Sequence, residues 1–137
     1  MPSDMQQELD SSWGFRANMP ASCAACQTTW HDLYTYAAAQ WPTDRQALIS
    51  SVRDPSIQGR FAPYTPLSTL DDFELAINAL ADDVLVPLPS FRVFYVATQG
   101  HVFLNGPLNE TITSGVSLAD FLQQLIDDDA GWSNVRP

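Results

Sequence analysis

Two cysteines, Cys23 and Cys26, lie three positions apart in the segment MPASCAACQTTW at 19–30, and the sequence has no others. Thiols at this spacing allow three interpretations: a redox-active pair, half of a metal site, or two small residues at the start of a helix. If a helix starts here, its unpaired N–H groups and positive dipole end would stabilise a thiolate and lower its pKa. Cys23 and Cys26 are therefore our candidate catalytic residues.

The two histidines are the other residues able to bind a metal. His31 follows Cys26 by five positions, and His101 lies in a predicted turn. Together with the cysteines they could supply four zinc ligands. Residues five apart on a helix point in different directions, however, so the spacing does not favour zinc. We expect no metal and no bound cofactor.

The charge composition argues against two classes of partner. The net charge is −10, and the basic side consists of six residues, all arginine, with no lysine in the chain. Binding to nucleic acid and to anionic membrane surfaces depends on clustered Lys and Arg. We therefore expect a protein as partner, with no direct contact to nucleic acid or membrane.

The first ten residues lack the basic and apolar parts of a secretory signal, and no apolar run approaches the roughly 18 residues that cross a bilayer. We therefore predict a cytoplasmic location. In a reducing cytoplasm, cysteines are more often catalytic or metal-binding than structural.

The elements that must position these residues follow from the hydrophobic pattern. The 137 residues fit one domain, which we place at 19–137 behind a polar arm at 1–18. Apolar residues at spacings of three and four predict helices at 26–40, 68–81 and 117–126, and Ser117 is a suitable N-cap. Strands are predicted at 46–53 and at 91–97, the latter apolar enough to be covered on both faces. A long connection is expected at 54–66. After the 91–97 strand we expect a turn at 98–101, a returning strand at 101–104 and a further strand at 110–113. Together these elements would form an α/β domain.

This order resembles the thioredoxin superfamily, in which a Cys-x-x-Cys heads a helix and a proline-led strand, a glycine-containing hairpin and a closing helix follow. The matching features are Cys23-Ala-Ala-Cys26, Leu88-Pro89 before the 91–97 strand, Gly100, and the 117–126 helix. The resemblance covers about 19–128 and implies a three-layer domain whose central sheet of about four strands is flanked by helices. The sequence departs from the family at Ser22, where a tryptophan is common, and has no lysine for the family's buried Asp/Lys pair.

The resemblance implies thiol–disulfide exchange on protein substrates, without a bound cofactor. Cys23 would attack, Cys26 would resolve the mixed disulfide, and Leu88 and Pro89 would form the substrate-binding edge, with Pro87 a competing candidate for the family's cis-proline. The alternative is a non-catalytic binding, assembly or inhibitory protein of the same fold, whose acidic surface engages a basic partner.

Overall fold

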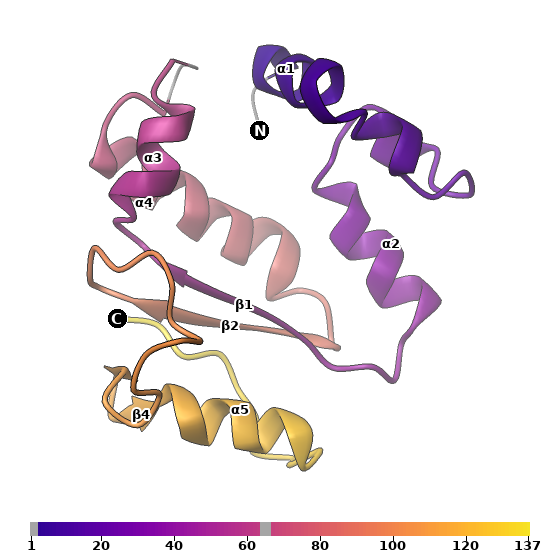
Figure 1. Ribbon diagram of the computed structural model, residues 1–137. Coiled ribbons are helices and arrows are strands. Elements are labelled where there is room, and N and C mark those ends of the chain that lie inside the picture. Colours follow the sequence, from indigo (N-terminus) through magenta and orange to yellow (C-terminus); the bar gives the residue numbers. More distant parts are fainter. Residues whose placement is uncertain (1–2, 64–66) are drawn as a thin grey trace.

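The computed structural model describes residues 3–63 and 67–137 (Figure 1). The helices are α1 Ser3–Trp13, α2 Asp32–Gln40, α3 Pro55–Phe61, α4 Leu70–Leu80 and α5 Leu118–Ile126. The strands are β1 Gln46–Ser51, β2 Phe91–Val96, β3 Ile112–Thr113 and β4 Val116–Ser117. Short 3₁₀ helices lie at Arg16–Asn18 and Ala25–Gln27, and a π-helical turn at Ala81–Leu85 continues α4.

The main sheet consists of β1 and β2, which pair in parallel with Gln46 opposite Phe91 and Ser51 opposite Val96. The chain between the two strands passes through α3 and α4, as parallel pairing requires a crossover. A single residue near the C-terminus extends the sheet beside β2: the Val135 carbonyl accepts from the Tyr95 N–H at 2.9 Å, and its N–H donates to the Val93 carbonyl at 2.9 Å. Among the described residues, β1 has a strand partner on one side only.

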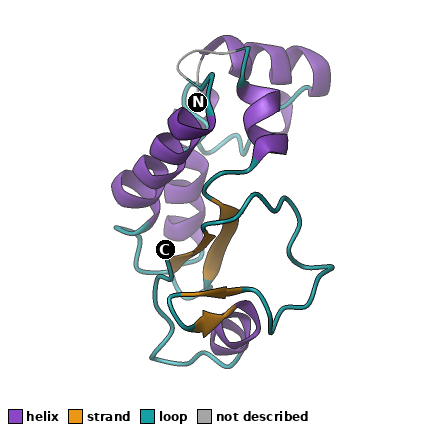
Figure 2. Ribbon diagram, turned by 90° about the vertical axis from the view of Figure 1, so that its left-hand side faces the viewer, coloured by secondary structure: helices purple, strands orange, loops and turns teal. Residues whose placement is uncertain are grey.

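β2 is the centre of the fold because both of its faces are covered. Phe91, Val93 and Tyr95 pack on the side of α4, whereas Phe94 and Val96 pack on the side of α5. This is the alternation that an extended chain imposes on its side chains. Figure 2 shows the strands between a group of helices on one side and a single helix on the other. The predicted central strand, covered on both faces, is confirmed.

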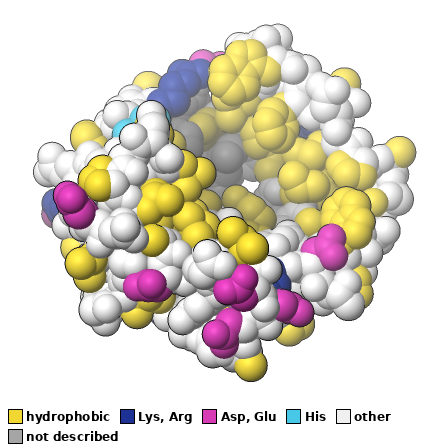
Figure 3. All heavy atoms as spheres, turned by 60° about the horizontal axis from the view of Figure 1, so that its bottom comes forward, with side chains coloured by type: hydrophobic (Ala, Val, Ile, Leu, Met, Phe, Trp, Pro, Cys, Tyr) yellow, Lys and Arg dark blue, Asp and Glu magenta, His cyan; other side chains and the backbone are white. Residues whose placement is uncertain are grey.

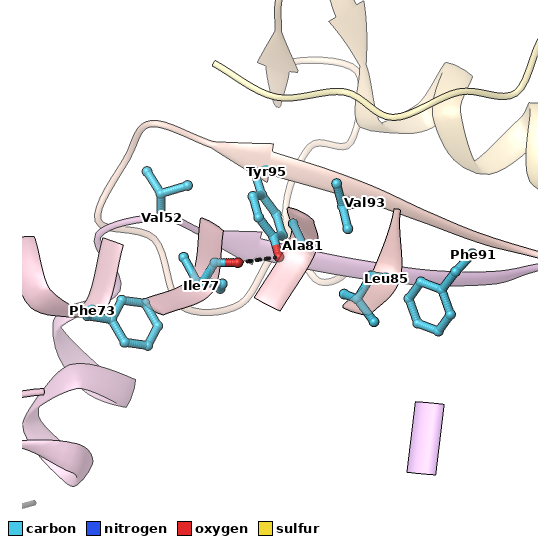
Figure 4. Packing of buried hydrophobic residues seen from close by; sticks show 8 residues of the cluster. All are labelled: Val52, Phe73, Ile77, Ala81, Leu85, Phe91, Val93 and Tyr95. Atoms are coloured by element: carbon cyan, nitrogen blue, oxygen red, sulfur yellow. Dashed lines mark hydrogen bonds between the residues drawn. The ribbon is translucent and has the colours of Figure 1, made fainter. Parts of the chain in front are cut away.

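Among the fully or nearly fully buried members of the core on the α4 side, Tyr95 carries the one polar side-chain atom, and that atom is hydrogen-bonded. Tyr95 is fully buried, and its hydroxyl donates to the Ile77 carbonyl at 3.1 Å (Figure 4). Burial raises the pKa of Tyr95 well above its usual range and also raises the pKa of Tyr34. The members of this core are Val52, Phe73, Ile77, Ala81, Leu85, Phe91, Val93 and Tyr95.

Side-chain caps define where three helices begin. Thr69 and Asp72 form a reciprocal capping box at α4, and Ser117 accepts from the Asp120 N–H at α5, at 3.0 Å. At α3, Asp54 accepts from the N–H groups of the next turn, and Pro55 occupies the first turn, where its missing N–H costs nothing. The predicted helices at 68–81 and 117–126 are confirmed to within a few residues.

The predicted thioredoxin-like fold with a central sheet of about four strands is wrong. The described residues form two separate two-stranded sheets, β1–β2 and β3–β4. No strand returns at 101–104, where Val102 and Leu104 are 60% and 66% exposed. Gly100, Gly106 and Pro107 favour turns around this segment, and the residue that bridges to β2 outside the β1–β2 pair is Val135.

Two further predictions need correction. The helix expected at 26–40 is interrupted, because α2 begins only at Asp32. The Thr28 hydroxyl donates to the Ala25 carbonyl at 3.0 Å, and two successive β-branched threonines disfavour helix continuation. The connection expected at 54–66 contains α3, and its residues 64–66 lie outside the described part of the chain. The segment at 1–18 includes the eleven-residue helix α1, and its division from 19–137 as a separate arm stays a prediction.

Candidate redox site

Cys23 and Cys26 are joined by a disulfide, with their Cα atoms 5.3 Å apart. The turn that precedes them brings the two thiols together: the Cys23 N–H donates to the Pro20 carbonyl at 2.9 Å, and Cys26 lies in the 3₁₀ helix Ala25–Gln27. The predicted pairing of the cysteines at this spacing is therefore present in the structure.

The two sulfurs have different surroundings. Cys26 is fully buried, whereas Cys23 is 5% exposed. The Cys26 N–H donates to Sγ of Cys23 at 3.3 Å. A backbone N–H stabilises a thiolate more than a thiol, so this hydrogen bond favours negative charge on Cys23 when the disulfide is open.

The expected thiolate stabilisation by a long helix is not available. The helix at Cys26 has only three residues, and α2 begins six positions later, at Asp32. A single turn has few aligned peptide dipoles. The N–H of Cys26 is thus the local group that distinguishes the two sulfurs.

The disulfide lies in a hydrophobic cluster, which we call the cysteine cluster. Its members are Met19, Cys23, Cys26 and Trp30, with Leu9, Leu33 and Tyr36 packed against them. Phe15 stacks on Trp30 with ring centroids 4.3 Å apart. Leu9 comes from α1, so part of the predicted arm packs on the disulfide segment. The indole N–H of Trp30 is buried and has no acceptor among the described residues.

Leu88 and Pro89 are not brought to the cysteines. Leu88 packs against the core on the α4 side and is not part of the cysteine cluster. Pro89 is exposed in the turn before β2, and its carbonyl accepts from Nη1 of Arg92 at 3.1 Å. Their substrate-binding role stays a prediction from the resemblance, because nothing in the packing tests it.

The histidines do not join the cysteines. His31 precedes α2 and is exposed. Nδ1 of His101 lies 2.8 Å from Oδ2 of Asp54, and the Asp54 carboxylate is buried. Within 3–63 and 67–137, no group of three or more His, Cys, Asp or Glu side chains is placed to hold a metal ion.

Sequence reasoning missed a groove of about 460 Å³ between α1 and α3. Trp30 and Leu9 belong both to this groove and to the cysteine cluster. Figure 3 shows one hollowed face of the molecule with hydrophobic side chains gathered around the hollow. The available signal was the pair of aromatic residues, Trp13 and Phe15, in an otherwise polar N-terminal segment.

Comparisons with known proteins assign no family. No protein-family model matches the chain, and neither the curated proteins nor the solved structures gave a match. The resemblance to the thioredoxin superfamily is therefore reduced to the spacing of Cys23 and Cys26 and their disulfide. In the described part of the chain, no helix is long and apolar enough to cross a membrane.

Proposed function

We propose that Cys23–Cys26 is a redox-active disulfide and that the protein is a thiol–disulfide oxidoreductase acting on protein substrates. The observation that carries this proposal is the asymmetry of the pair: the Cys26 N–H donates to Sγ of Cys23, and the exposure that the pair has lies on Cys23. Cys23 is then the sulfur that a substrate meets and Cys26 the resolving thiol.

The small size of the disulfide loop supports the proposal. The cross-link joins residues only three positions apart, so the loop-closure estimate gives it about 2 kcal/mol, near the lower end for protein disulfides. A structural cross-link usually joins distant segments, where the loss of chain entropy is larger. Neither cysteine belongs to the cores on the two sides of β2, so we expect these cores to persist when the bond opens, as a redox cycle requires.

The atoms and electrons of the exchange reaction balance without a cofactor. A substrate thiolate attacks Sγ of Cys23, the S–S bond breaks, and Cys26 leaves as a thiolate that takes up a proton. A second substrate thiolate then attacks the substrate sulfur of the mixed disulfide, and Cys23 leaves. Two electrons pass from the substrate dithiol to the protein, and the reverse sequence reduces a substrate disulfide.

A redox titration tests the proposal. The protein is equilibrated in glutathione buffers, its thiols are trapped with a mass-tagging alkylator, and the oxidised fraction is plotted against potential. We expect a reversible two-electron transition between about −120 and −270 mV, the range of working oxidoreductases. Thiols that pair only irreversibly, under strong oxidant, would refute the proposal.

Two matched variants test the asymmetry. Cys26→Ser leaves Cys23 free, and we expect it to accumulate a mixed disulfide with a thiol-containing substrate protein. Cys23→Ser leaves only the fully buried Cys26, and we expect much less trapping. Equal trapping by both variants would contradict the assigned roles.

The second candidate, an acidic binding protein, is favoured by one surface. Asp71, Glu74, Asp82 and Asp83 line the same exposed side of α4 and the turn after it. Arg53 and Arg136 pair with three of these carboxylates, which leaves this face net negative. The test is salt-dependent binding of an arginine-rich peptide, which Asp82→Asn with Asp83→Asn should weaken and Cys23→Ser should not.

A further inference from the structure

We propose that the groove between α1 and α3 is a binding site for a small uncharged amphipathic molecule: an apolar body with one hydroxyl group, as in an alkylphenol. The hydroxyl would bond to Nε2 of His101. This inference stands independently of the redox proposal, because it depends on the groove's own walls.

The walls of the groove are mostly apolar and come from several separate parts of the chain. Met5, Leu9 and Trp13 of α1 form one side with the Phe15–Trp30 stack, and Ile57 of α3 forms the other. The volume of about 460 Å³ lies within the range of small-molecule sites. Trp13 is 70% exposed, so an apolar ligand would cover aromatic surface that now faces water.

One end of the groove is polar, and its geometry is fixed. Nδ1 of His101 lies 2.8 Å from Oδ2 of the buried Asp54, whose Oδ1 accepts from the N–H groups of Ser56 and Ile57 at 2.8 and 3.0 Å. Asp54 is thus held at both oxygens, and it orients the imidazole ring. His101 is 48% exposed on its side chain, and within the described residues Nε2 has no hydrogen-bond partner.

The charges around the groove are already matched, which sets the class of ligand. Arg60 pairs with Glu8 at 2.6 Å, and the buried Asp54 carboxylate is held by two backbone N–H groups and by the His101 ring. A charged ligand would find no unpaired counterion here and would lose its hydration on the apolar walls. A hydroxyl, in contrast, can donate to Nε2 of a neutral imidazole or accept from Nε2–H of a protonated one.

The test uses 4-butylphenol as the probe, with binding to the full chain measured by isothermal calorimetry and by tryptophan fluorescence. We expect saturable 1:1 binding that is stronger than that of 4-butylbenzoate, which carries a carboxylate on the same body. Absence of saturable binding, or tighter binding of the anion, would overturn the proposal.

Two variants with matched controls locate the site. Ile57→Asp places a charge in the apolar wall and should weaken binding of 4-butylphenol at least tenfold, whereas Leu75→Asp, at an exposed position of α4, should not change it. Equal effects of the two substitutions would place the probe elsewhere and overturn the assignment.

His101→Phe keeps a ring and removes the hydrogen bond. It should weaken the binding of 4-butylphenol by about 2- to 12-fold, the range expected for the loss of one neutral hydrogen bond, and leave the binding of butylbenzene unchanged. His31→Phe, at the exposed histidine, is the control and should not change the binding of either probe. Equal weakening of both probes by His101→Phe would assign His101 a purely structural role and would contradict the proposed contact.

Discussion

Reduction of the disulfide should weaken the fold only slightly. Cys23–Cys26 closes a loop over a sequence separation of three. For a loop this short, the chain-entropy relation gives about 2 kcal/mol at 25 °C. Both side chains pack in the cysteine cluster, and a thiol is a small hydrophobic group, so little burial is lost when the bond opens. We therefore expect the free energy of unfolding to fall by about 2 kcal/mol.

Urea unfolding monitored by circular dichroism measures this change, in the presence and absence of a phosphine reductant. The slope of the free energy of unfolding against urea concentration (the m value) should stay nearly constant, because the same surface is exposed on unfolding. The double variant Cys23→Ser with Cys26→Ser is the control, and its stability should not respond to the reductant.

Unfolding on reduction, or a loss of more than about 4 kcal/mol in the free energy of unfolding, would refute the loop-entropy estimate. The disulfide would then be a structural cross-link, and a cycle through a folded reduced state would be excluded. A loss near 2 kcal/mol with an unchanged far-ultraviolet spectrum would support both the loop-entropy estimate and the proposed cycle.

Three further predictions concern the fold that holds the site. Because burial raises the pKa values of Tyr95 and Tyr34, their contribution to the free energy of unfolding should be constant below pH 10, the ordinary tyrosine pKa, and fall as the pH rises beyond it. Tyr95→Phe should reduce this loss in urea titrations at pH 8–11 and cost about 1 kcal/mol at neutral pH. Phe121→Ala should cost about 3–5 kcal/mol in chemical denaturation, because Phe121 is fully buried against Phe94 and Trp132; a cost below 1 kcal/mol would contradict that packing. Thr69→Ala should cost about 0.5–2 kcal/mol by removing the α4 capping box, and the exposed Ser133→Ala, as its control, should change little.

The elements predicted correctly from the sequence are those whose signals are local. β2 combines β-branched and aromatic residues in an almost unbroken apolar run, and both of its faces are buried. α4 and α5 combine an N-cap at Thr69 or Ser117 with an apolar stripe, and both helices begin where the cap places them. In these segments the hydrophobic pattern and the local sequence preferences favour the same structure, so tertiary packing does not override the prediction.

The errors arose where the outcome depends on tertiary packing that the local pattern does not show. The segment at 101–104 was expected to return as a hairpin strand beside 91–97, but within the described residues no strand pairs with it, and Val135 bridges to β2 instead. The spacing of Cys23 and Cys26 predicted their proximity but not their burial, which depends on Met19, Trp30 and the distant Leu9. The groove needed the same tertiary information, because α1 and α3 form its walls from separate parts of the sequence.

In the part of the chain that the structure describes, β1 pairs on one side only, and this has a consequence for association between chains. A strand with unpaired backbone groups along one side can act as a template for a strand of another molecule, and long, flat apolar strands carry the greatest risk of aggregation. β1 has only six residues, and Gln46, Ser50 and Ser51 make half of it polar. Arg45 and Arg53 flank it, and each is held by carboxylates, Arg45 by Asp128 at the end of α5 and Arg53 by two acids of α4. Short length, polar residues and flanking charge are features by which natural sheets limit aggregation at an open side.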